Sequence, residues 1–207
     1  MSNVTYPPLS TTNAVPNTLQ RAFQNEEYAR QFIAGDIRFG LLQHYREMEG
    51  CRQDKTEGRA ALRLNLQAEN PDLNNVCYSL SSLIPYYILC TSHPAVCKRD
   101  LTKFGSFIVS INEPLRLLER IRTAWNNDDR ALHPAFITPV LYNKGDLVDP
   151  APFFFEPSCL TYTQKPPSYS PDREYRYGLA CKVRTKEDPF LTLRVEPCND
   201  ICSFVIP

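Results

Sequence analysis

The chain has 207 residues, of which 43% are hydrophobic and 22% charged, and this is enough for one globular domain with a buried core. Its 23 Lys and Arg residues balance its 23 Asp and Glu residues, so no overall charge indicates binding to nucleic acid or to an anionic membrane. No apolar run approaches the roughly 18 residues that a transmembrane helix needs, and the first residues lack the pattern of a secretory signal. We therefore expect a soluble cytoplasmic protein that does not bind membranes.

The eight cysteines are scattered along the chain, and no two of them form a CxxC pair. A zinc knuckle therefore has no starting motif, and the chain is much longer than the small secreted domains that depend on disulfides. Several cysteines lie in apolar runs, where a free thiol behaves as a small hydrophobe. This pattern predicts unpaired thiols, a reducing compartment and no metal site.

Residues 1–16 are predicted to form a polar, proline-containing leader, followed by a single α+β domain over residues 17–207. The first element of that domain is a predicted helix over residues 17–34, which Asn17 or Thr18 caps and Gly35 ends. Alternating apolar and polar residues, or runs of aromatic and β-branched residues, then predict strands. These strands are Asp36–Leu41, Arg59–Leu66, Val76–Leu80, Tyr86–Thr91 and Phe104–Ile111.

A second helix is predicted where Asn112 can cap and Pro114 falls in the first turn. Its apolar face comprises Leu115, Leu118, Ile121 and Trp125. Ten of the 18 prolines lie at or after Pro139, which favours short strands joined by rigid loops and argues against further helices. The late strand candidates are Phe136–Tyr142, Phe153–Phe155, Glu174–Val183, Phe190–Val195 and Ile201–Ile206.

Short strands with two helices and no alternating βαβ rhythm predict an α+β fold with a mixed or mostly antiparallel sheet. No GxGxxG motif follows a strand, and the seven glycines include no P-loop spacing. These two absences exclude the commonest nucleotide-binding architectures.

Three polar features are candidates for chemistry, and the first runs from Arg38 to Gly58. Arg38 lies on a strand with apolar neighbours, and Tyr45 and Arg46 follow it. Arginine suits phosphate, and tyrosine offers a face for stacking. The alternative is a solvated excursion in which the charges pair with one another.

The second feature is an apolar strand that runs directly into Thr91, Ser92, His93 and Pro94. Hydroxyl groups at a strand end can hold a ribose or orient a carboxylate. The alternative is that the two hydroxyls cap a turn before the proline.

The third feature is a proline-stiffened loop that leads into a strand beginning with Glu174. By alternation, Glu174 and Arg176 lie on one face of this strand, while Tyr175 and Tyr177 lie on the other. The pair is either a structural ion pair or a catalytic carboxylate held ionised beside a phosphate ligand.

Together, the segments FGLLQHYREMEGCRQDKTEG, KFG and DREYR resemble a broad group of poorly characterised bacterial proteins, in which a strand of the last type closes the domain. Their order also resembles the ADP-ribosyltransferase fold of toxins and antiphage effectors that modify DNA, RNA or protein. That fold carries an Arg or His on its first core strand, a Ser-Thr-Ser-like strand next and a Glu on a late strand.

The resemblance implies that Arg38 holds NAD, that Thr91 and Ser92 belong to the hydroxyl motif, and that Glu174 is the catalytic glutamate. The sequence departs from the motifs of that fold at two positions. Cys90 replaces the first serine, and Asp172 occupies the place of a second Glu or Gln, which argues against arginine side chains as the acceptor.

If the resemblance holds, NAD is the substrate, no metal is needed, and the acceptor is RNA, DNA or protein. Catalysis would involve Arg38, Ser92 and Glu174, with Glu174 stabilising the positive charge that develops on the ribose. A toxin or antiviral effector of this kind would have an antitoxin partner. The full set expected to bind NAD is Arg38, Tyr45, Arg46, Tyr78, Thr91, Ser92 and Arg176.

Two other classes remain open. A metal-dependent nuclease would use Asp54, Glu57 and Glu174 as Mg²⁺ ligands with Lys165 nearby. A non-catalytic interaction protein, such as an antitoxin or an inhibitor, would use the polar segment as its binding surface.

Overall fold

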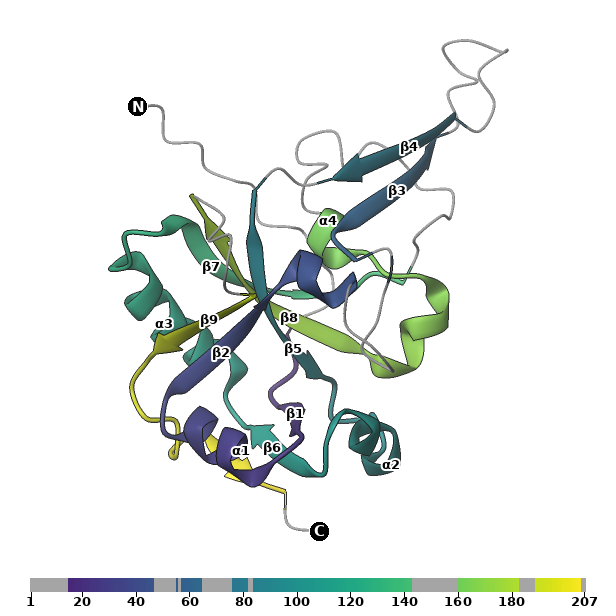
Figure 1. Cartoon of the computed structure of the whole chain (residues 1–207). Coiled ribbons are helices and arrows are strands. Elements are labelled where there is room, and N and C mark those ends of the chain that lie inside the picture. The colour runs from purple at the N-terminus through teal and green to yellow at the C-terminus, as the bar shows by residue number, and fades with distance from the viewer. Residues whose placement is uncertain are drawn as a thin grey trace.

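The computed structural model describes residues 15–46, 55, 57–64, 76–81, 84–142, 160–182 and 189–205. Almost all of the predicted leader and the strand candidate Phe153–Phe155 lie outside these residues. Figure 1 shows a central sheet with a few short helices around it and a separate pair of strands projecting from one end. Within the described residues, no helix has the length and apolar character of a membrane span.

The main sheet has eight strands, and every strand pair in it is antiparallel. This confirms the predicted α+β class with a mostly antiparallel sheet. The strands are β1 (Leu19–Phe23), β2 (Asp36–Leu41), β5 (Tyr86–Ser92), β6 (Phe107–Ile111), β7 (Ala131–Pro139), β8 (Glu174–Cys181), β9 (Phe190–Arg194) and β10 (Cys202–Phe204). Strands β3 (Arg59–Leu64) and β4 (Val76–Ser81) pair with each other in a second sheet.

Strand β5 is the centre of the main sheet, because β8 pairs with it along its whole length. On its other edge, β2 pairs with Tyr87 and Ile88, while β1 pairs with Ser92 at the far end. Strands β1 and β2 therefore diverge along one edge of β5, and helix α1 (Glu26–Ile33) connects them (Figure 1). The stretch of β5 between these two contacts borders the site described below.

The helix predicted over residues 17–34 is wrong in its first half, which forms β1. Leu19 and Phe23 are buried, and their four-residue spacing fits one face of a helix as well as one face of a strand. Pairing with β6 over five residues decides the outcome, because tertiary contacts override local propensity. Helix α1 starts only after Asn25, whose side chain accepts a hydrogen bond from the backbone N–H of Tyr28.

The second predicted helix is confirmed as α3 (Pro114–Asn126), although details of its start differ. Its N-cap is Glu113 instead of Asn112, and Leu115 is 55% exposed while Leu117 is fully buried. The short helical elements are α2 (Lys98–Leu101), α4 (Leu160–Thr163) and the 3₁₀ helices η1 (Leu42–Arg46), η3 (Thr102–Phe104) and η5 (Pro167–Asp172). The prediction of no later helix is wrong for two short elements, α4 and η5, and η5 carries a proline in its first turn, where the missing N–H is tolerated.

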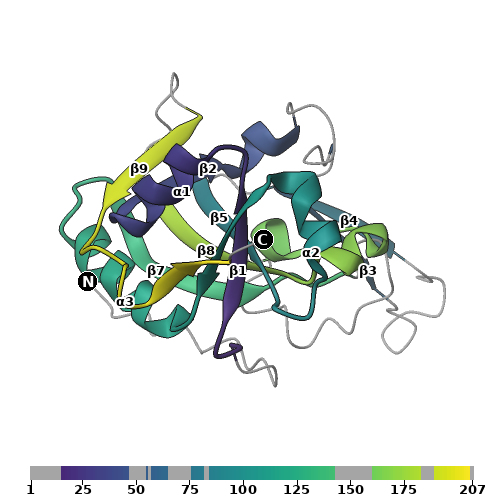
Figure 2. The same cartoon turned by 90° about the horizontal axis from the view of Figure 1, so that it is seen from below.

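Two clusters of buried side chains lie on opposite faces of the sheet. The larger one joins α1 and α3 to alternate residues of the strands, such as Ile37, Leu89 and Tyr177. The smaller one includes Ile88 and Tyr86 and packs against α4 and η1. Figures 1 and 2 both place α2 on the opposite side of β1 from α3. Alternation along the strands directs Arg38, Ser92 and Glu174 away from the larger cluster.

The five cysteines whose surroundings the structure describes are all free thiols, namely Cys90, Cys97, Cys181, Cys198 and Cys202. Three of them are buried and one is half-buried, as expected for thiols that act as small hydrophobes. The other three cysteines stay predictions.

Candidate functional site

The candidate site is built on a row of residues that crosses three neighbouring strands. Gln20 of β1 lies opposite Ser92 of β5, and Ser92 lies opposite Glu174 of β8. Directly opposed residues in an antiparallel pair have side chains on the same face and within contact distance. Ser92 is 7% exposed and Glu174 is 6% exposed, so both side chains are close to the interior.

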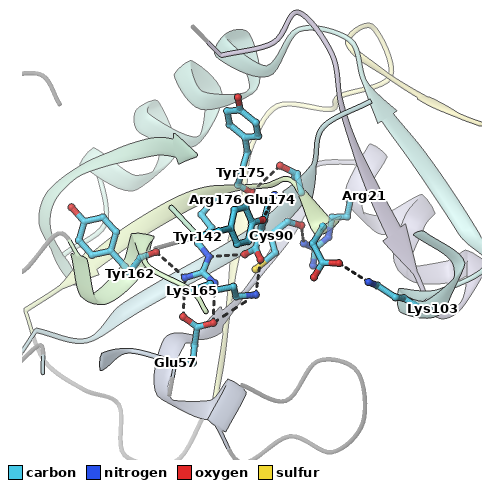
Figure 3. Close-up of polar contacts among 12 residues, drawn as sticks. Arg21, Glu57, Cys90, Lys103, Tyr142, Tyr162, Lys165, Glu174, Tyr175 and Arg176 are labelled. Carbon is cyan, nitrogen blue, oxygen red and sulfur yellow. Dashed lines mark hydrogen bonds and ion pairs between the residues drawn. The ribbon is translucent and has the colours of Figure 1, made fainter. Parts of the chain in front are cut away.

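Two residues beyond Glu174, Arg176 holds the two acidic side chains of the site together (Figure 3). Its Nε donates to Oε1 of Glu174 at 2.6 Å. Its Nη1 and Nη2 donate to the two carboxylate oxygens of Glu57 at 2.9 and 2.8 Å. Nη1 also donates to the carbonyl of Tyr162 at 2.8 Å, which leaves the fully buried guanidinium well satisfied. The predicted ion pair between Glu174 and Arg176 is therefore present.

Lys165 supplies the second cation of this group. Its Nζ lies 2.6 Å from Oε2 of Glu174 and 3.8 Å from Oε2 of Glu57. Its backbone N–H donates to the carbonyl of Leu141, which fixes the lysine beside the end of β7. We call Glu57, Lys165, Glu174 and Arg176 the buried charge quartet. Two carboxylates balance two cations in it, and such balance with good hydrogen bonding is what makes buried charges tolerable.

The ionisation of Glu174, of Lys165 and of the neighbouring Cys90 follows from these contacts. Burial opposes ionisation of Glu174, but the charges of Arg176 and Lys165 outweigh it and hold the pKa of Glu174 well below its usual range. Burial also opposes the charged form of Lys165, but the nearby carboxylates raise its pKa. Burial, assisted by the charge of Glu174, raises the pKa of the Cys90 thiol to about 12. The site therefore presents an ionised carboxylate beside a neutral thiol.

The backbone also constrains Glu174. Arg173, the residue before it, has φ 41° and ψ 52°, a left-handed conformation that is strained for a residue other than glycine. The backbone N–H of Glu174 donates to the hydroxyl of Tyr142 at 2.6 Å, and the carbonyl of Arg173 accepts from the N–H of His93 at 3.0 Å. These contacts fix the turn through which the chain enters β8.

Arg21 is the site residue that the sequence analysis missed. It lies on β1, and its Nη1 donates to the carbonyl of Cys90 on β5 (Figure 3). Its guanidinium carbon lies 5.2 Å from the centre of the Phe23 ring. Because residues 17–34 were predicted as one helix, no strand was available to carry this arginine. The four-residue spacing of Leu19 and Phe23 offered no signal that would have separated the two structures.

Two neighbouring cavities lie beside these residues, and residues of β1 line both of them. The first encloses about 90 Å³, and its walls include Ser92, Lys165 and Glu174. The second encloses about 280 Å³ and is lined by residues of β2, α1 and β9, including Arg38. Arg21 and Tyr45 line both cavities and so form the wall between them.

Tyr45 has this position because β2 has a glycine beneath it. A Cβ atom at Gly40 would come within 2.8 Å of the Tyr45 hydroxyl and 2.9 Å of its ring. The absent side chain at Gly40 thus makes room for the tyrosine over the strand.

Arg38, Ser92 and Glu174, the three residues expected to take part in catalysis, do not all line the same cavity. Ser92 and Glu174 share the first cavity, while Arg38 lines the second. All three nevertheless lie on the same face, because Gly40 of β2 and Gly178 of β8 both oppose Ile88 of β5. The strand order separates Arg38 from Glu174, since β5 lies between β2 and β8.

The other predicted residues divide into three groups. Thr91 directs its hydroxyl to the carbonyl of Tyr175 at 3.0 Å, so this hydroxyl is engaged within the sheet. Tyr45 and Arg176 both line the first cavity. The side chains of Arg46 and Tyr78 lie outside the part of the chain whose side chains are described. At the rim, Asp172 forms an ion pair with Lys103.

Two of the proposed Mg²⁺ ligands, Glu57 and Glu174, do meet beside Lys165, whereas Asp54 is outside the described residues. Each of their four carboxylate oxygens already contacts Arg176 or Lys165. Among the described residues, no group of three or more His, Cys, Asp and Glu side chains is arranged to hold a metal ion.

Comparison of the chain with protein-family models, with curated protein sequences and with solved structures found no match. The residues of the two cavities and the strands that carry them are therefore the basis for a functional proposal.

Proposed function

We propose that the protein is an ADP-ribosyltransferase that uses NAD as its substrate, and that its sheet is a variant of the ADP-ribosyltransferase fold. The observation that carries this proposal is the pairing of Ser92 with Glu174 on neighbouring strands, with Arg21 on the strand next to them. An arginine on the first strand, a hydroxyl on the next and a glutamate on a late strand is the order that the resemblance implies. Arg21 takes the place first given to Arg38.

The site fits the electrostatics of this reaction. In the transfer, the bond between the nicotinamide nitrogen and C1 of the ribose breaks, nicotinamide leaves with the electron pair, and an acceptor oxygen or nitrogen bonds to C1 and releases its proton to water. Positive charge develops on the ribose as the bond breaks. Glu174 is held ionised by Arg176 and Lys165, each of which takes one lone pair of its carboxylate, and in this proposal the lone pairs that remain face the ribose as that charge develops. Ser92, directly opposite, is placed to bond a ribose hydroxyl.

The quartet assigns a supporting role to Arg176 and Lys165. Both oxygens of Glu174 accept hydrogen bonds, one from each cation. These bonds fix the carboxylate and keep it deprotonated. In this proposal Arg176 does not bind phosphate, because the side chain is fully buried and donates four hydrogen bonds within the protein.

The sizes of the cavities fit an extended ligand. Pockets for drug-sized ligands enclose roughly 300–1,000 Å³, so the first cavity, at about 90 Å³, has room for only a part of NAD. The second cavity continues past Arg21 and Tyr45. Its Arg38 remains a candidate for binding the diphosphate, as the sequence analysis proposed for this residue. The acceptor would be RNA, DNA or protein, and the biological role that of a toxin or antiviral effector.

Release of nicotinamide from labelled NAD tests the proposal without knowledge of the acceptor. We expect the wild-type protein to release nicotinamide in the presence of EDTA. The rate of release should fall about 10²–10³-fold in the single variant Ser92→Ala and in the double variant Lys165→Gln/Glu174→Gln, because each lacks a contact to the ribose. Arg99→Ala, a change at an exposed residue that lines neither cavity, is the matched control. Folded wild-type protein that neither releases nicotinamide nor transfers label to nucleic acid or protein would refute the proposal. Cleavage of nucleic acid that EDTA abolishes would support the nuclease instead.

A further inference from the structure

The second cavity contains a stacked arrangement of an arginine and an aromatic ring. Arg38 of β2 is exposed, and its guanidinium carbon lies 3.6 Å from the centre of the Phe190 ring on β9. The ring of Tyr28 on α1 lies 5.9 Å from the same carbon and is also exposed. A separation as short as 3.6 Å is that of a planar guanidinium stacked on an aromatic face. We call Arg38, Phe190 and Tyr28 the stacking shelf.

The charge of the shelf is not neutralised within the described protein. Among the described residues, Arg38 takes part in ring contacts and in no ion pair. The nearest acidic residue on the same strand face, Asp36, is paired with Arg194. The exposed guanidinium of Arg38 therefore offers its in-plane N–H groups to an anion, and the exposed Tyr28 ring beside it offers a surface for stacking.

We propose that the stacking shelf binds the base of a nucleotide, with the adjoining phosphate on the N–H groups of Arg38. Nucleobases stack on aromatic side chains and on arginine guanidinium planes, and the phosphate matches the donor fork of arginine. Gln24 lines the same cavity and provides an amide group for the base edge, whereas the amide nitrogen of Gln31 already donates to Glu27 at 2.9 Å. A nucleotide bound to the shelf would lie in the second cavity, and Arg21 and Tyr45 would separate it from the first cavity, which Glu174 lines.

The source of the base is either NAD itself or a nucleic-acid acceptor, and this part of the assignment rests on the proposed function. Stacking of a base on the shelf does not depend on the proposed transferase activity, because the shelf lies in a different cavity from Glu174. Binding to the shelf and release of nicotinamide are therefore separate measurements.

The test is titration calorimetry of the full chain with AMP, ADP, ribose 5-phosphate and a short single-stranded RNA. We expect ADP, the RNA or both to bind, and ribose 5-phosphate, which lacks a base, to bind much more weakly. Arg38→Lys keeps the charge but removes the plane, and Phe190→Leu keeps the apolar volume but removes the ring. Each should weaken binding about 5- to 100-fold, whereas Arg99→Ala should leave it unchanged.

Each outcome decides one of the two proposals. Binding of AMP and ADP that depends on the shelf identifies the base of a free nucleotide, and binding of RNA alone identifies an acceptor base. Equal affinity of wild type, Arg38→Lys and Phe190→Leu for every ligand, or no binding at all by folded protein, overturns the shelf. Nicotinamide release that is insensitive to both variants overturns the NAD assignment of the shelf but not the reaction. Shelf-dependent binding by a protein that never releases nicotinamide overturns the reaction but not the shelf.

Discussion

Arg176 binds Glu57 through two parallel hydrogen bonds of 2.9 and 2.8 Å, although the two residues are 119 positions apart in the chain. Arg176 is fully buried and Glu57 is 2% exposed, so water does not weaken the pair. The contact ties the segment that precedes β3 to the middle of the main sheet. It also holds the guanidinium in the orientation in which its Nε faces Glu174.

Arg176→Met should lower the free energy of unfolding by about 3–5 kcal/mol, because it leaves the carboxylate of Glu57 buried without its partner. Glu57→Gln/Arg176→Met should cost less than the sum of the two single changes, since Lys165 and Glu174 then remain as a balanced pair. Urea unfolding of the four proteins in this cycle measures the coupling. Additive losses would show that the pair contributes no interaction of its own.

Glu174→Gln should abolish nicotinamide release, and it should also destabilise the fold, because Lys165 and Arg176 then face a single carboxylate. The compensated variant Lys165→Gln/Glu174→Gln restores charge balance in the quartet. We expect it to melt closer to wild type than Glu174→Gln does, and to remain inactive. Activity in the compensated variant would mean that Glu174 has a structural role alone.

Acid should destabilise the wild type more than the compensated variant. The pKa of Glu174 is held below the 4.5 of an ordinary glutamate, so this group binds fewer protons in the folded than in the unfolded state. The stability it contributes is therefore complete above about pH 4.5 and is lost as the pH falls toward the folded pKa. Urea midpoints at pH 7, 5, 4 and 3 measure the difference. Parallel curves would contradict the assigned ionisation of Glu174.

All eight cysteines should react with an alkylating reagent in denaturant without prior reduction. The five described thiols are free, and the chain has no feature that predicts pairing of the others. Intact-mass measurement should therefore show eight labels per chain. A species with six labels that gains two on reduction would reveal a disulfide and overturn the expectation of a reducing compartment.

Much of the sheet could be predicted because its strands carry local patterns. Strand β2 matches its predicted bounds, and β5 and β8 differ by one or two residues at one end. The shared face of Glu174 and Arg176 follows from alternation alone, and their ion pair is observed. Ser92 could also be predicted as a candidate, because its hydroxyl comes at the end of an apolar strand.

The rest depended on contacts between distant parts of the chain. Arg21 became a site residue only because β1 pairs with β6 and β5, which turned half of a predicted helix into a strand. Arg38 moved to a neighbouring cavity because β5 lies between β2 and β8, an order that alternation within one strand does not contain.

Sequence by itself determined which residues of a strand share a face, because the backbone sets that alternation locally. Tertiary structure alone decided that Glu57 and Lys165 would join Glu174 and Arg176. A buried charge takes whichever opposite charge the fold brings within hydrogen-bonding distance. That choice depends on how strands far apart in the chain pair, and no local pattern encodes it.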